Sequence, residues 1–152
     1  MPDKFHTQVN ETLMEIYNSI GKVEDRMLQS SVLDLSICEL DMVSVIAKRG
    51  NDGASISQIA KDLGVTLPTV TVAVQRLEAK DFVEKARCSQ DARKVNVVLT
   101  RMGKKADAAH RYFHERMVRS LLAGVDDEQK QLLLSALRNL GAFLRGIGEA
   151  EL

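Results

Sequence analysis

The chain has 152 residues and no tryptophan, and its 21 basic and 21 acidic residues leave a formal net charge of zero. This length predicts one domain with its own core, and the absence of a long apolar run or a leader pattern favours a cytoplasmic protein without a membrane partner. Only the distribution of charge is informative about partners: residues 1–44 carry eight acids and three bases, whereas residues 85–105 carry seven bases and one acid. Such a local basic stripe is typical of a phosphate-binding surface.

Apolar residues at spacings of three and four predict a first helix over about 5–28. A second helix is expected from about 34–36, and a glycine-containing loop at 50–53 follows it. Its inward face would be apolar, with Leu40, Val43, Ile46 and Ala47.

The next segment has the local signals of a helix-turn-helix. Ser55 and Gln58 have the spacing of a capping box, which predicts a short helix that ends at Gly64. Thr66 can cap the following helix, and Pro68 fits its first turn because an N–H there has no helical partner. A basic hairpin follows, so the order of elements indicates a winged helix-turn-helix. The inward face of the second of these helices would consist of Val70, Ala73, Val74 and Leu77.

After the hairpin, Thr100 can cap a long helix to about residue 122, and Asp126 can cap a last helix after Gly124. The terminal helices carry more apolar surface than one small domain needs, which predicts a homodimer with intertwined chain ends. In such a dimer the two winged helix-turn-helix units, called reading heads below, are related by symmetry. Together they would bind a near-palindromic operator in double-stranded DNA, with half-sites one turn, roughly 34 Å, apart. The fold expected is mainly α with a small β-wing: one domain over 1–152, with a DNA-binding unit at 34–105 and dimerisation helices at 1–33 and 106–152.

The segment 35–103 resembles MarR-type transcription regulators nearly without gaps. Within that family it is most similar to the fatty-acid biosynthesis repressors, on residues 65–71, 77–80, 87–91 and 112–118. Two positions depart from the family pattern. Asp81 stands where glycine is usual, and aspartate tolerates the left-handed backbone such a turn needs. Ala92 stands where a wing arginine is common, so one DNA contact would be lost.

The outward face of the second helix of the helix-turn-helix carries short hydroxyl, amide and guanidinium groups, which suit base edges in a major groove. The run Asp91-Ala-Arg93 matches the Asp-x-Arg motif of the family, which implies Arg93 in the minor groove with Asp91 holding its guanidinium. Hydroxyl groups at a helix start and two flanking bases would contact phosphates. The predicted DNA-binding residues are Ser55, Ser57, Pro68, Thr69, Thr71, Gln75, Arg76, Arg87, Asp91, Arg93 and Lys94.

The resemblance implies an effector pocket between the dimer arms and the reading head. An apolar slot there would suit an acyl chain. The likeness therefore implies a repressor of lipid-synthesis genes that responds to a long-chain acyl group carried by acyl carrier protein. The residues expected to line the pocket are Tyr17, Ile20, Met42, Val43, Ile46, His110, Phe113, His114 and Met117.

Two alternatives to the acyl effector stay open. His110 and His114 stand four apart on one helix face, so a zinc-responsive regulator is the first alternative, with Glu24 and Asp41 as further ligands. Otherwise these histidines pack in the core, lie in solvent or line the acyl pocket. A cysteine-based redox sensor is the second alternative: Cys38 and Cys88 lack metal-ligand spacing and are expected to be free thiols, but cations near Cys88 favour its thiolate. No hydrolase or phosphate-loop motif occurs in the sequence, and neither an enzyme nor a resident cofactor is expected.

Overall fold

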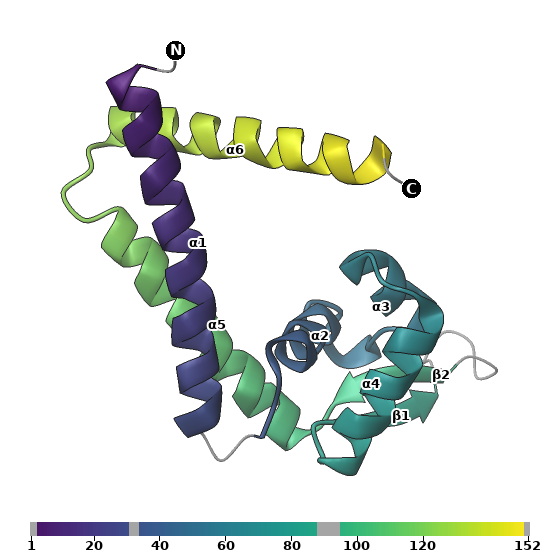
Figure 1. Cartoon of the computed structure of the whole chain (residues 1–152). Helices are drawn as coiled ribbons and strands as arrows, with labels where there is room; N and C mark the ends of the chain where they lie inside the picture. The colour runs from purple at the N-terminus through teal and green to yellow at the C-terminus, as the bar shows by residue number, and fades with distance from the viewer. Residues whose placement is uncertain (1–2, 31–33, 88–94, 151–152) are drawn as a thin grey trace. The chain divides into compact units, whose positions relative to one another are not determined.

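The computed structural model describes residues 3–30, 34–87 and 95–150, and it forms two compact units, residues 1–111 and 112–152 (Figure 1). The described elements confirm the predicted mainly helical chain with a small β-wing. No described helix is both long and apolar enough to span a membrane. The expected pairing of 1–33 with 106–152 concerns a dimer and stays a prediction. In chain order the elements are α1 (Lys4–Ser30), α2 (Ile37–Ala47), the 3-10 turn η1 (Gly50–Asp52), α3 (Ile56–Leu63), α4 (Leu67–Ala79), β1 (Val83–Arg87), β2 (Val95–Leu99), α5 (Arg101–Leu121) and α6 (Asp127–Ala150).

Local capping signals set the helix boundaries of the reading head. The Ser55 hydroxyl accepts from the backbone N–H of Gln58, whose side chain in turn accepts from the N–H of Ser55, so the predicted capping box is confirmed. Gly64 ends α3 with φ 65° in the left-handed region, as a terminal glycine does. Thr66 caps α4 by accepting from the N–H of Thr69, and proline lies in the first turn. The helix-turn-helix geometry therefore follows from residues a few positions apart.

The core of the first unit lies between α2, α3, α4 and the wing, which Figure 1 shows gathered together. Burying an aliphatic side chain of this size contributes about 1.5–3 kcal/mol, so this cluster holds α4 in one orientation. Four of the residues at its centre, Val43, Ile46, Ile59 and Val70, have no exposed surface at all. Ala73, predicted to face inward, packs against the edge of the cluster and is only partly buried.

The wing hairpin is antiparallel, with Val83 opposite Leu99 and Arg87 opposite Val95. Ala54 pairs with β2 as well, because its N–H donates to the carbonyl of Val97 and its own carbonyl accepts from the Val97 N–H. This pairing attaches the hairpin to the segment before α3. The predicted hairpin tip, including Cys88, lies outside the described residues.

The turn between α4 and β1 brings the start of α5 against the end of α4, the helix expected to contact DNA bases and called the reading helix below. Asp81 adopts φ 63°, which confirms the left-handed turn expected for it. Thr100 donates from its hydroxyl to the Asp81 carbonyl and from its N–H to the Phe82 carbonyl. The same hydroxyl accepts from the N–H of Gly103, which confirms that Thr100 caps α5.

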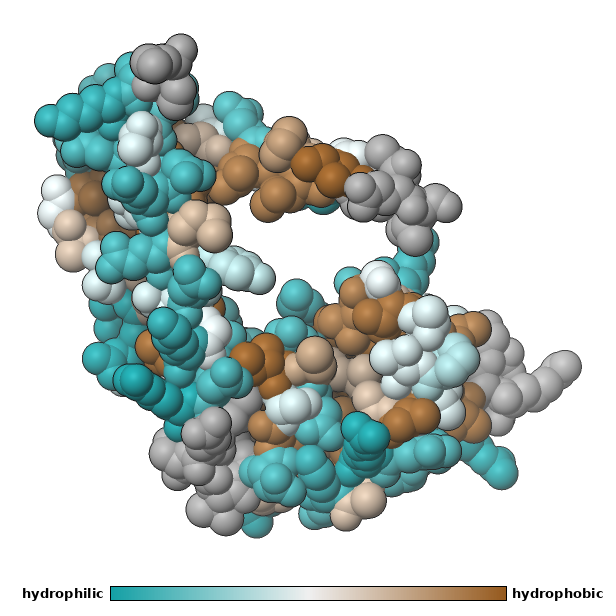
Figure 2. Space-filling model, viewed as in Figure 1, coloured by the Kyte–Doolittle hydropathy of each residue, from teal (hydrophilic) through white to brown (hydrophobic). Residues whose placement is uncertain are grey.

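In the second unit, Asp126 and Gln129 cap α6 reciprocally, side chain to backbone. Much of the apolar surface of α6 is exposed in the single chain, for example Leu132 at 68% and Phe143 at 63%, and Figure 2 shows apolar residues gathered along this helix. In the first unit, α1 likewise exposes Phe5 at 70%. In the single chain, both helices therefore leave many of their large apolar side chains exposed.

Candidate nucleic-acid interface

The outward face of α4 is available to a ligand because the inward face is fully packed. Val70, Val74 and Leu77 are at most 1% exposed, which leaves the opposite side of the helix in solvent. The Thr71 hydroxyl donates to the Leu67 carbonyl at 2.9 Å, so toward a ligand this oxygen is an acceptor. The exposed residues of the outward face are Pro68, Thr69, Thr71, Val72, Gln75 and Arg76.

The groups expected to contact phosphate differ in their exposure and in their hydrogen-bond partners. The half-buried Ser55 uses its hydroxyl as the cap of α3 and lies 3.1 Å from the exposed Ser57 hydroxyl. Arg87 is exposed at the end of β1. Lys85, part of the basic stripe, pairs with Glu78 of α4 at 2.9 Å. The wing residues Asp91, Arg93 and Lys94 lie outside the described residues.

A buried carboxylate connects the end of the reading helix to α2. Glu39 accepts from the Ser36 N–H at 2.8 Å and from the Ser36 hydroxyl, and it lies 3.3 Å from the ammonium of Lys80, the residue that follows α4. Lys80 also donates to the Asp34 carbonyl at 2.6 Å. Burial by itself raises the pKa of Glu39. The hydrogen bonds from Ser36 and Lys80 and the positive charge of Lys80 together lower it by more, so the pKa of Glu39 lies below its usual range. The spacing of Ser36 and Glu39 is that of a capping box, so the sequence contains a signal for this part of the network. No local sequence pattern indicates the contact of Lys80 with Glu39, because the two residues lie 41 positions apart.

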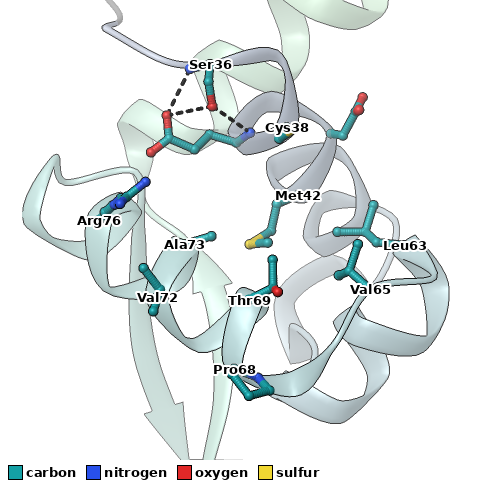
Figure 3. Close-up of a pocket in the computed structure, with 12 residues that line it drawn as sticks. Ser36, Cys38, Met42, Leu63, Val65, Pro68, Thr69, Val72, Ala73 and Arg76 are labelled. Carbon is teal, nitrogen blue, oxygen red and sulfur yellow. Dashed lines mark hydrogen bonds between the residues drawn. The ribbon is translucent and has the colours of Figure 1, made fainter.

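A cavity of about 620 Å³ lies between α2 and α4 beside the outward face (Figure 3). In Figure 3, Met42 points into this space, and Val72 and Arg76 of α4 lie along its other side. Met42 is the one predicted effector residue that lines it. Asp41 also lines this cavity and is exposed, and its role as a zinc ligand with His110 stays a prediction. Cys38, a free and exposed thiol, lies at the same cavity.

The predicted effector residues of the first unit do not share one environment. Val43 and Ile46 have no exposed surface and pack in the core, so their apolar periodicity reflects the core of the reading head rather than a pocket wall. Tyr17 is 75% exposed on α1, and Ile20 is half-buried. In the second unit, Phe113 and Met117 are half-buried.

His110 joins three helices of the first unit. Its Nδ1 lies 2.9 Å from the Ser44 hydroxyl of α2, and its Nε2 lies 3.7 Å from a Glu24 carboxylate oxygen of α1. The side chains of His110 and Glu24 are 12% and 13% exposed, so this group is largely shielded from water. His114 follows one turn later on α5 and is half-buried, with its ring edge against Phe113.

Comparison with known proteins was consistent with this geometry. A model of the MarR family matches residues 39–95. The structure of Streptococcus pneumoniae FabT in complex with DNA aligns with a TM-score of 0.81 and 34% identity, covering 93% of this chain and 99% of that chain. An S. aureus MepR–DNA complex aligns with a TM-score of 0.70, but its 22% identity, over 88% of this chain and 94% of that one, shows a shared fold alone. The uncharacterized HTH-type transcriptional regulator YhjH of Bacillus subtilis (strain 168) is 25% identical over 68% of this chain, and the match spans 58% of the length of that relative.

Proposed function

Because the chain belongs to the MarR family, we propose that it is a dimeric, sequence-specific DNA-binding regulator of transcription. The observation that carries this proposal is the outward face of α4: a helix locked by its core side presents hydroxyl, amide and guanidinium groups to solvent. A helix of this kind enters a major groove and reads base edges there. The basic residues at and after the wing supply the charge that phosphate binding needs.

Dimerisation would explain the exposed apolar faces of the terminal helices. Leucine and phenylalanine side chains along α6, such as Leu144 at 58% exposure, are costly to leave in water. A second copy of the chain offers the same faces, and a two-fold dimer places two reading heads on one near-palindromic operator. Analytical ultracentrifugation at micromolar concentration tests this directly, and a well-folded monomer would contradict it.

For the effector we propose a long-chain acyl group, presented by acyl carrier protein, and for the regulated genes those of lipid synthesis. The support is the sequence likeness to fatty-acid biosynthesis repressors on residues 65–71, 77–80, 87–91 and 112–118. Within the proposed pocket, Met117 is the residue whose enlargement tests the slot, since Val43 belongs to the core. Met117→Trp is expected to abolish the effect of the acyl group while basal DNA binding persists.

A zinc-responsive regulator is the second candidate, because Glu24 and His110 already face one another. A carboxylate oxygen and an imidazole nitrogen 3.7 Å apart can both bind one zinc ion, and His114 on the next turn of α5 is the expected third ligand. Zinc binding would break the Glu24–His110 pair and replace it with two metal bonds. His110→Ala combined with His114→Ala is expected to remove any change in operator affinity that zinc causes.

Gel-shift titrations of the DNA upstream of the chain's own gene distinguish these candidates. The probes are long-chain acyl carrier protein, zinc and a chelator, each added to the wild-type protein on the same duplex. Coupling between an effector site and a DNA site is typically about 1–3 kcal/mol, a five- to 150-fold change in affinity that such a titration resolves. A zinc response without an acyl response would overturn the acyl proposal, and no binding to any duplex would overturn the regulator itself.

A further inference from the structure

We propose that Val72 is a specificity-determining residue of the reading head and that it recognises the C5-methyl group of thymine in the major groove. The inference rests on the proposed binding of α4 to DNA. Apart from Pro68, the other candidate contacts on this surface are polar, and Val72 adds an apolar one.

Val72 lies on the side of α4 opposite the core. Helix periodicity places Val70, Val74 and Leu77 on one side, where they are at most 1% exposed, and Val72 on the other, where 47% of its surface is exposed. The core therefore makes no use of this side chain, although valine is a poorer helix former than alanine. Val72, at the centre of the outward face, is therefore available to contact a ligand.

The neighbours of Val72 make it the apolar centre of a polar surface. One turn away along the helix lie the exposed Thr69, Gln75 and Arg76, each able to hydrogen-bond to a base or a phosphate. Val72 also lines the cavity between α2 and α4, so there is open space beside its side chain (Figure 3). A groove that accepts the polar neighbours must also bring base edges to this valine.

The chemistry of the major groove leaves one complement for this side chain. A valine can neither donate nor accept a hydrogen bond, and thymine is the base that presents an apolar group, its C5-methyl, in the major groove. Because a β-branched side chain on a helix strongly prefers one χ1 rotamer, the two methyl groups of Val72 are held in place before DNA arrives. A contact with thymine then needs little ordering of the protein.

Two other apolar side chains near α4 are less well placed. Leu67 is 52% exposed, but it is the first residue of the helix and its position on the helical wheel borders the packed side. Val65 is 40% exposed, but it belongs to the turn before the helix. Val65 is therefore a matched control, a valine of similar exposure off the outward face.

The test uses duplexes that the wild-type protein selects from a random-sequence library. Each thymine of a selected site is replaced by deoxyuridine, which removes only the methyl group and keeps every hydrogen-bonding group. At one thymine position of each half-site, we expect the replacement of that thymine by deoxyuridine to weaken binding by the wild-type protein about fourfold. This factor corresponds to about 0.8 kcal/mol for one buried methyl group. Val72→Ala is expected to bind the thymine and deoxyuridine duplexes equally at that position, whereas Val65→Ala is expected to keep the fourfold ratio.

Each other outcome overturns the proposal. Equal wild-type affinity for both duplexes, selected sites without thymine in each half-site, or a fourfold ratio that survives in Val72→Ala would show that Val72 reads no methyl group. Loss of the ratio in Val65→Ala but not in Val72→Ala would assign the contact to the turn. If the wild-type protein selects no duplex at all, DNA binding itself fails, an outcome distinct from binding without methyl discrimination. Circular dichroism of each variant checks that it is folded.

Discussion

Replacing Gly103 with alanine should destabilise the protein, although alanine is the better helix former. A Cβ atom at Gly103 would lie 2.1 Å from the carbonyl oxygen of Phe82 and 3.2 Å from the Leu99 side chain. The first contact is with backbone, which cannot rotate aside, so either α5 or the turn at Phe82 has to move. Gly103 is thus what allows α5 to begin directly against the end of the reading helix.

The size of the effect follows from two opposing contributions. Forcing extra atoms into a packed site costs typically about 1–3 kcal/mol, and a backbone obstacle favours the upper end of that range. Helix propensity returns about 1 kcal/mol when alanine replaces glycine. The net loss expected is about 2 kcal/mol, which lowers the midpoint of thermal unfolding by about 4–8 °C for a chain of this size.

The matched control is Gly21→Ala in α1, where nothing lies within 4 Å of the added Cβ. There the propensity gain should act alone and raise the free energy of unfolding by up to about 1 kcal/mol. Both variants and the wild type are unfolded thermally at one protein concentration, because a dimer's midpoint depends on concentration. If Gly103→Ala proves as stable as Gly21→Ala, the close approach of α5 to Phe82 is wrong.

The remaining predictions concern the carboxylate network, the wing and the dimer. Glu39→Gln should cost about 1.5–3 kcal/mol at neutral pH, the scale of a hydrogen bond to a charged group. Because the folded pKa of Glu39 is lowered, its contribution is present above the ordinary glutamate value of about 4.3 and is lost as the pH falls through the folded pKa. Urea unfolding from pH 7 to pH 3 should therefore show the two proteins converging in acid, and a constant difference would contradict this. Arg93→Ala should weaken operator binding by about 1–3 kcal/mol, while Lys94→Ala should weaken specific and random DNA alike with a shallower salt dependence. Unchanged affinity of Arg93→Ala at constant salt would show that the wing assignment is wrong. Replacing Leu140 and Leu144 together with aspartate should abolish the dimer and operator binding, because an unpaired charge buried in an apolar seam costs several kcal/mol; sedimentation as an intact dimer would refute that.

Most boundaries of the reading head could be predicted because their causes are local. The capping box of Ser55 and Gln58, the terminal Gly64 and the Thr66 cap each involve residues within four positions of one another, and each is observed. The left-handed turn at Asp81 was likewise accessible, since few residue types tolerate that backbone.

Helical periodicity shows that a face is apolar but not what covers it. For this reason the sequence predicts Val43 and Ile46 at an effector pocket, whereas the structure buries them in the core cluster of the reading head. The same limit applies to Asp41, whose neighbours depend on how α2 lies against α4.

The sequence by itself determined the winged helix-turn-helix and the candidate reading surface, because caps, turn residues and apolar periodicity act over a few residues. Only the tertiary structure decided which contacts hold that surface in place. Lys80 reaches Glu39 from 41 positions away, and Gly103 admits the carbonyl of Phe82 at a distance that no other residue allows. Contacts of this kind depend on how the helices and strands pack against one another, and local sequence preferences do not determine that packing.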